Sequence, residues 1–197
     1  MKTALLIIDL QNDFLAGGSL AVPDGDEIIS HINKLQKRYD LVVATQDWHP
    51  ADHGSFASQH PGKKMYELAE LGGLPQVLWP DHCIQGSYGA ELNVALNQQC
   101  IAAIFRKGMD PQIDSYSAFF DNGHKKATGL EGYLKGLGIE EVHVCGLAAD
   151  YCVFYSAMDT LNLGFKVAII NKATKAISPE GYVKAQQELI SSGGRII

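Results

Sequence analysis

The sequence predicts a three-layer α/β/α fold, in which helices cover both faces of a mainly parallel sheet of about six strands. The first observation is a set of short, almost continuously apolar runs rich in β-branched residues, which is typical of strands buried on both faces. The second is that helical patterns separate these runs. The third is a length of 197 residues without a linker or internal repeat, from which we expect one domain over residues 1–197.

Five apolar runs are the expected strands of this sheet. They cover residues 3–11, 40–47, 100–108, 141–147 and 164–171. The end of the chain, residues 195–197, is a further short apolar stretch. We expect it to add a sixth strand at an edge of the sheet.

The first helix is expected over residues 24–38, directly after Pro23. Its apolar side chains recur at helical spacing and share one face: Ile28, Ile29, Ile32 and Leu35. Asp24 and Glu27 have the spacing of a capping box, in which two side chains bond the first free N–H groups of a helix.

Two more helices are expected in the second half of the chain. The first covers residues 151–164 and ends at Gly164. The second covers residues 178–194, with Ser178 as the N-cap and Pro179 in the first turn.

Two long segments, residues 48–90 and 108–124, do not fit the strand and helix rhythm. Both are irregular, and the first is rich in glycine, proline and histidine. Long irregular segments in a compact domain are usually functional or disordered. Their many aromatic residues favour a functional role.

Charge and the first residues of the chain limit the partners. The formal net charge is −6 and no run of lysine or arginine is present, which argues against a nucleic acid or an anionic membrane as partner. The first apolar run is interrupted by Asp9, so it resembles neither a signal peptide nor a membrane span. We therefore expect a cytoplasmic protein with a small neutral or polar ligand; a homo-oligomer is left open.

The chain has four cysteines: Cys83, Cys100, Cys145 and Cys152. The cytoplasm keeps thiols reduced, so a structural disulfide is not expected. Cys145 lies inside an expected strand and is interpreted as a core residue. Cys152 instead follows a turn of small residues and opens an expected helix, where the helix N-terminus and a nearby lysine stabilise a thiolate.

Reactive side chains follow the ends of several expected strands. Ligands of open parallel sheets bind beyond the carboxyl ends of the strands, so Asp9, Asp47, His49, Lys107 and Cys152 are expected to converge there. A buried carboxylate needs a partner, which favours an Asp9–Lys107 pair, although a turn cap and a snorkelling lysine are the simpler interpretations of each alone. A carboxylate beside Cys152 can accept the thiol proton.

A metal site is predicted from two of the irregular motifs. Asp47 and His49 alternate along TQDWHP, so their side chains point the same way, and His82 in WPDHC is a further candidate ligand. One aspartate and two histidines, completed by water, suit Zn²⁺, with Fe²⁺ or Mn²⁺ as alternatives. His53 and His60 are interpreted as incidental histidines of a polar loop.

Five motifs together resemble those of a known family. DLQNDF (9–14), TQDWHP (45–50), WPDHC (79–83), FRKG (105–108) and GLAADYCV (146–153) occur in the order and spacing of the nicotinamidases, within the isochorismatase-like cysteine hydrolases. The resemblance covers almost the whole chain. It implies an isochorismatase-like hydrolase domain and an enzyme that converts nicotinamide to nicotinate and ammonia.

The resemblance also implies a role for each matching position. Asp9, Lys107 and Cys152 match the catalytic triad, and Asp47, His49 and His82 match the ligands of one divalent metal ion. Ser55 matches a position that in some relatives contacts the metal directly or through water. The Leu147–Ala148 bond matches a cis peptide, and the N–H groups of Ala148 and Cys152 match an oxyanion hole. Phe14, Trp79 and Tyr116 match an aromatic substrate pocket.

The implied reaction is amide hydrolysis through a thioester on Cys152, in NAD salvage, with pyrazinamide as a further substrate. A related cysteine amidohydrolase acting on another small amide or N-carbamoyl compound is the alternative. A metal-water amidase without a role for Cys152, and a binding protein without turnover, are further hypotheses that measurements of ammonia release separate.

Overall fold

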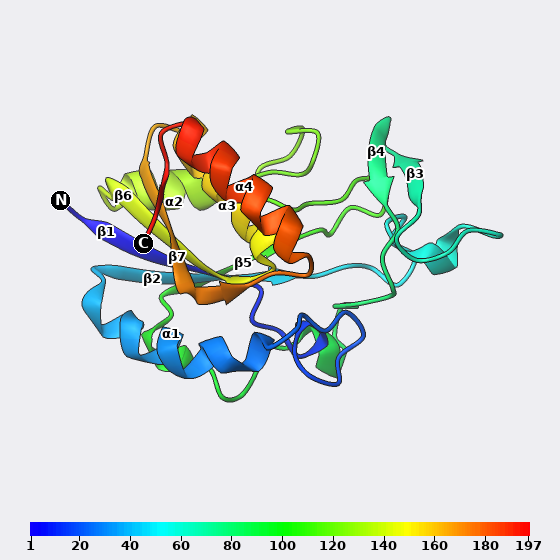
Figure 1. The fold of residues 1–197 in the computed structure, drawn as a ribbon, viewed down its shortest axis with the longest axis horizontal. Helices are drawn as coiled ribbons and strands as arrows, with labels where there is room; N and C mark the ends of the chain where they lie inside the picture. Colours follow the sequence, from blue (N-terminus) through cyan, green and yellow to red (C-terminus); the bar gives the residue numbers. More distant parts are fainter.

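The main sheet has six parallel strands in the order β5-β2-β1-β6-β7-β8. The computed structural model describes residues 1–197 (Figure 1). The strands of this sheet are Thr3–Ile8 (β1), Leu41–Asp47 (β2), Ala103–Lys107 (β5), Glu141–Leu147 (β6), Lys166–Lys175 (β7) and Arg195–Ile196 (β8). The predicted α/β class, the parallel sheet and the short C-terminal edge strand are therefore confirmed.

The core lies on both faces of the sheet, and β1 shows why its sequence is apolar without interruption. Leu5 and Ile7 belong to one hydrophobic cluster, whereas Ala4, Leu6 and Ile8 belong to the other. All five are fully buried. A central strand with both faces covered has no solvent side, so alternation disappears from its sequence.

Four helices cover the sheet. They are Ile29–Leu35 (α1), Leu130–Gly136 (α2), Phe154–Asn162 (α3) and Pro179–Ser191 (α4). Helix α1 lies on one face, and α2, α3 and α4 lie on the other (Figure 1). None of the helices has the length and apolar character needed to cross a bilayer.

The first predicted helix is shorter than expected, and the capping box is wrong. Residues Gly25–Ile28 form a 3₁₀ turn before α1 begins. Asp24 has a left-handed backbone, with φ of 55°, and its side chain makes no capping bond. That backbone directs its carboxylate toward the Lys175 ammonium, 3.7 Å away, and away from the helix N–H groups.

The other two predicted helices are correct in kind. Residues Ala149–Val153 form one π-helical turn, so α3 starts later than the sequence suggested. Gly164 lies just past the end of α3 with φ of 88°. The Ser178 hydroxyl accepts a 3.1 Å bond from the Gly181 N–H, as expected of an N-cap.

Two features differ from the sequence interpretation. Strand β5 lies at the sheet edge, with Ile104 exposed and Arg106 packed over the Trp48 ring, so it is not buried on both faces. The segment expected to be irregular contains an antiparallel hairpin, Leu68–Leu71 (β3) and Leu74–Val77 (β4), which projects from the body of the protein (Figure 1).

Candidate active site

The carboxyl ends of β1, β2, β5 and β6 place five chemically active side chains together. Asp9 follows β1, Asp47 ends β2 and Lys107 ends β5. Cys152 lies in the π-helical turn after β6, and His49 follows β2. All five are buried, so their mutual contacts are not weakened by solvent.

Lys107 is the centre of this arrangement. Its Nζ lies 2.9 Å from Asp9 Oδ2 and 2.5 Å from Asp47 Oδ1. The same ammonium donates to the Cys152 Sγ at 3.3 Å and to the Ser115 carbonyl at 3.0 Å. Burial opposes the charge, but the Asp47 and Asp9 carboxylates outweigh it and hold the pKa of Lys107 well above its ordinary value.

The two carboxylates beside Lys107 have opposite acidities. Burial raises the pKa of Asp9, and the attraction of Lys107 offsets only part of this rise. For Asp47, burial acts in the same direction, but Lys107 and His49 outweigh it and hold its pKa well below the ordinary value. Asp9 is therefore the better proton acceptor of the pair, and Asp47 is the permanent anion.

Asp9 is held in place by Thr45. The Thr45 hydroxyl donates a 2.6 Å bond to Asp9 Oδ1 and accepts a 3.2 Å bond from the Asp9 N–H. One oxygen of Asp9, one of Asp47 and the Cys152 sulfur lie within 4.8 Å of one another. Asp9 and Cys152 are thus neighbours, and Lys107 contacts both of them.

The Cys152 thiol differs from the sequence expectation of a stabilised thiolate. Burial raises its pKa well above the ordinary value, and the Lys107 charge opposes this only in part. The resting side chain is therefore a thiol that needs a base. The Leu147–Ala148 peptide is cis, as the resemblance implied, and the Ala148 N–H donates no hydrogen bond within the protein.

Three side chains form a cluster with the chemistry of a metal site. The Nε2 atoms of His49 and His82 lie 3.7 and 3.9 Å from Asp47 Oδ2. The Nδ1 atoms are bonded at 2.8 Å to the carbonyls of Gly108 and Pro80, which leaves both Nε2 atoms directed at the carboxylate. Such backbone bonds orient metal-binding imidazoles, so these residues fit a divalent cation.

An aromatic pocket adjoins these groups. It is lined by Phe14, Trp79 and Tyr116 of the sequence prediction and by further residues from other elements: Leu20, Asp47, His82, Asp114, Ala148, Tyr151, Cys152 and Ile177. The Trp79 indole donates to the Tyr116 hydroxyl at 3.2 Å. The free volume is about 20 Å³, so the walls lie close together around the sulfur.

Comparison with known proteins places the chain in a family. The Isochorismatase domain model matches residues 3–197. The chain belongs to the isochorismatase family. The nicotinamidase of Escherichia coli strain K12 is 49% identical over 199 residues, which cover 98% of this chain and 93% of that protein.

Solved isochorismatase-family structures agree with this relationship. An Acinetobacter baumannii nicotinamidase/pyrazinamidase superposes with a TM-score of 0.96 at 47% identity, covering 100% of this chain and 95% of that one. A Pyrococcus horikoshii pyrazinamidase in complex with zinc has a TM-score of 0.81 at 37% identity, covering 100% and 99% of the two chains.

Two buried residues beside the metal cluster, His53 and Asp114, were not predicted from the sequence as part of this site. The His53 ring lies beside the His49 ring at a tilt of 44°, with ring centroids 4.2 Å apart, and its Nε2 has no partner. A His53 nitrogen, a His49 nitrogen and an Asp114 oxygen lie within 4.8 Å of one another. The spacing of four residues from His49 to His53 was the available signal. His60, in contrast, bonds the Gly54 carbonyl.

Ser55 and Tyr151 complete the placement of the candidate residues. The Ser55 hydroxyl lies 2.7 Å from His53 Nδ1 and bonds none of Asp47, His49 and His82. Tyr151, beside Cys152 in the chain, packs edge-on against Trp79 at 4.9 Å and was not predicted. Its position next to the cysteine was the only sequence signal for it.

Proposed function

We propose that this protein is a nicotinamidase, a hydrolase that converts nicotinamide and water to nicotinate and ammonia. The observation that carries the proposal is the buried contact of Lys107 with Asp9 and Cys152, directly beside the Asp47–His49–His82 cluster. A nucleophile, a base and a metal cluster in one aromatic pocket match the carboxamide and the ring of this substrate. The nicotinamidases among its relatives support the same activity.

The catalytic cycle begins with the thiol. Because burial raises the pKa of both Cys152 and Asp9, a proton can pass from the sulfur to the carboxylate as the sulfur attacks the carboxamide carbon. Lys107 contacts both Asp9 and Cys152, so it stabilises negative charge on the carboxylate and on the sulfur. The N–H groups of Ala148 and Cys152 are the proposed donors to the developing oxyanion.

The same groups release the two products in turn. Asp9 returns its proton to the departing ammonia and leaves a thioester on Cys152. Asp9 then removes a proton from a water molecule, whose oxygen attacks the thioester carbon. The carbon–sulfur bond breaks, Asp9 returns the proton to the Cys152 sulfur, and the acid leaves and ionises to nicotinate. Each step needs a carboxylate that accepts and returns a proton, which is the role the raised pKa of Asp9 suits.

Asp47, His49 and His82 would hold one divalent metal ion, with Zn²⁺ as the first choice. When bound, the metal supplies a Lewis-acidic position that fixes the ring nitrogen of the substrate. Phe14 and Trp79 are proposed to hold the ring between them. Pyrazinamide carries the same carboxamide and a similar ring, so we expect it to be hydrolysed as well.

The four cysteines and the reaction fit a cytoplasmic enzyme of NAD salvage. None of the cysteines forms a disulfide. This agrees with a reducing compartment. The partner that the proposed active site implies is its small-molecule substrate, nicotinamide.

The test measures ammonia release from nicotinamide by wild type, Cys152→Ala and Cys100→Ala, each with and without a strong chelator. Cys100 is exposed, so its substitution is the matched control. We expect release by wild type and Cys100→Ala, a loss on chelation, and none by Cys152→Ala. Equal release by all three proteins would remove the thioester from the mechanism.

A further inference from the structure

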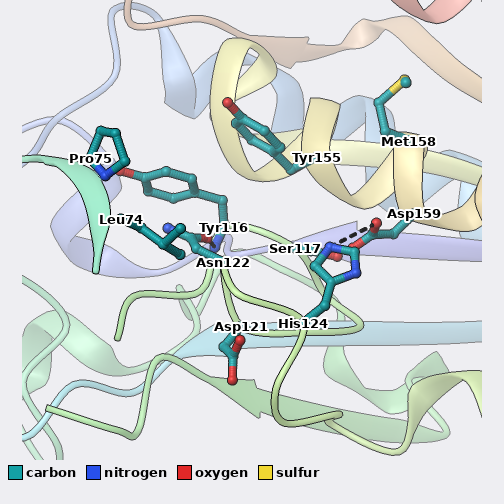
Figure 2. Close-up of a pocket in the computed structure, with 10 residues that line it drawn as sticks. All are labelled: Leu74, Pro75, Tyr116, Ser117, Asp121, Asn122, His124, Tyr155, Met158 and Asp159. Carbon is teal, nitrogen blue, oxygen red and sulfur yellow. Dashed lines mark hydrogen bonds and ion pairs between the residues drawn. The ribbon is translucent and has the colours of Figure 1, made fainter. Parts of the chain in front are cut away.

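A second cavity lies on the far side of Tyr116 from the catalytic pocket. Its volume is about 320 Å³, within the range of small-molecule sites. Tyr116 lines both cavities, so the two share one wall residue. Figure 2 shows Leu74, Pro75 and Tyr116 on one side of this space, and His124 and Asp159 on the other.

Asp159 is the carboxylate that this cavity offers to a ligand. The side chain projects from α3 and is only 8% exposed, yet neither of its oxygens accepts a hydrogen bond from the protein. Its one ion-pairing neighbour is the His124 imidazole, whose Nε2 lies 3.5 Å from Oδ1. Neither Asp159 oxygen is among the fully buried polar atoms without a partner, so the carboxylate is open to the cavity and can meet a ligand there.

The acidic side chains that line this cavity carry negative charge. Asp121 is a second carboxylate of the wall, and its oxygens accept the N–H groups of Gly123, Lys125 and Lys126. No lysine or arginine lines the cavity. Fixed negative charge in a concave, partly desolvated space favours a cation.

The rest of the lining is apolar and aromatic. Tyr116 and Tyr155 stack with ring centroids 5.4 Å apart, and Met158 and Pro75 add further apolar surface. Aromatic faces attract cations whose charge is spread over carbon, and such faces beside a carboxylate are typical of sites for alkylated ammonium groups. A bare metal ion fits poorly, because the Asp121 oxygens already accept three N–H groups, which leaves Asp159 as the one carboxylate of the wall without such bonds.

We propose that this cavity is an accessory site for a small organic cation whose charge is spread over alkyl or aromatic carbon, such as a quaternary ammonium ion. Asp159 balances the charge, and the rings of Tyr116 and Tyr155 contact the carbon groups.

Occupancy of the accessory site reaches the catalytic pocket through Tyr116. The Tyr116 hydroxyl accepts bonds from Trp79 at 3.2 Å and from Gln76 at 3.1 Å. A cation that holds the Tyr116 ring therefore changes the wall against which the substrate ring packs. This kinetic consequence rests on the proposed function, whereas binding of the cation does not.

Binding is tested by calorimetry on the intact protein, with choline as the probe and dimethylbutanol, its neutral carbon analogue, as the matched ligand. We expect choline to bind about tenfold or more tightly than dimethylbutanol, because only choline carries the charge. Asp159→Asn should weaken choline binding by about tenfold, and Glu67→Gln, an exposed carboxylate outside the cavity, should not.

Three results would overturn the proposal: no choline binding, equal binding of both ligands, or unchanged choline binding by folded Asp159→Asn. If Asp159→Asn fails to fold, Tyr155→Leu carries the test, since Tyr155 is 44% exposed and its loss should also weaken binding. In ammonia-release assays, choline should change the KM for nicotinamide in wild type but not in Asp159→Asn. An equal change in both would place the cation in the catalytic pocket instead.

Discussion

Replacing Lys107 with methionine should destabilise the folded protein by about 3–5 kcal/mol at neutral pH. Methionine has a similar length and no charge, so the change removes the ammonium while keeping most of the volume. The structure leaves Asp9 and Asp47 buried without their cation, at positions where Nζ now lies 2.9 and 2.5 Å from their oxygens. No other lysine or arginine pairs with either carboxylate.

The magnitude follows from two opposing contributions. At an effective dielectric constant of about 20, the attraction across 2.9 Å to Asp9 is about 6 kcal/mol, and the attraction across 2.5 Å to Asp47 is about 7 kcal/mol. Burying an ammonium costs several kcal/mol, and the variant no longer carries that cost. The net loss is smaller than the sum of the attractions, because the carboxyl groups left without a cation in the variant take up protons. It agrees with the loss of about 3–5 kcal/mol seen when one partner of a buried ion pair is removed.

The loss should depend on pH in one direction. Without Lys107, the pKa values of Asp9 and Asp47 in the folded protein rise above those in the unfolded chain, where aspartate has a pKa of about 3.9. A carboxyl group with a raised folded pKa destabilises the fold increasingly as the pH rises through the unfolded value. In wild type, Lys107 holds the pKa of Asp47 well below the ordinary value, so that stabilisation is already present at about pH 4 and is missing from the variant. The deficit should therefore be present at about pH 4 and grow further toward neutral pH.

Urea unfolding of wild type and Lys107→Met measures this deficit. A chelator must be present, because a bound divalent cation would neutralise Asp47. Lys126→Met, which removes an exposed lysine paired with Asp110, is the control and should change stability little. A Lys107→Met protein as stable as wild type, or a deficit that is constant with pH, would refute the electrostatic reasoning.

Three further predictions concern the neighbours of these groups. Thr45→Val removes a hydrogen-bond donor to Asp9, and this loss should raise the pKa of Asp9. When the rate of ammonia release is measured against pH, its acid limb should therefore move to higher pH. An unchanged profile would contradict the role of Asp9 as the base. Gly108→Ala places a methyl group against the His49 imidazole at a left-handed position with φ of 67°, so zinc retention in a chelator titration should fall. Gly146→Ala overlaps the backbone of Ile8 and should lower the free energy of unfolding by about 4 kcal/mol or more.

Two other glycines serve as controls that separate the effect of the close contacts at Gly108 and Gly146 from the effect of a left-handed backbone. Gly62 and Gly138 also have positive φ, of 83° and 69°, but a methyl group on either meets no atom within 4 Å. Gly62→Ala should therefore retain zinc, and Gly138→Ala should lose much less stability than Gly146→Ala. Equal effects within either pair would show that the close contacts contribute nothing.

The fold could be predicted because the relevant information lies in short stretches of the chain. The apolar run that becomes β1 is continuous because both of its faces are covered, and that pattern is visible without the rest of the protein. The same reasoning failed for β5, because whether a strand lies at the edge depends on which strands pair beside it.

The convergence of Asp9, Lys107 and Cys152 was also predictable, since each follows the carboxyl end of a parallel strand. His53 and Asp114 were not, because they lie in long segments without periodicity, whose paths depend on distant contacts. The hairpin β3–β4 was missed because its strands are exposed or half-buried except at Gln76 and carry little apolar pattern.

By itself, the sequence determined the strands, their parallel arrangement and the residue types gathered at one edge of the sheet. Only the tertiary structure decided the protonation of those residues. Asp9 and Asp47 are the same residue type and both contact Lys107, yet their pKa values move in opposite directions. The cause is the balance between burial and neighbouring charge, which depends on distances between segments far apart in the chain.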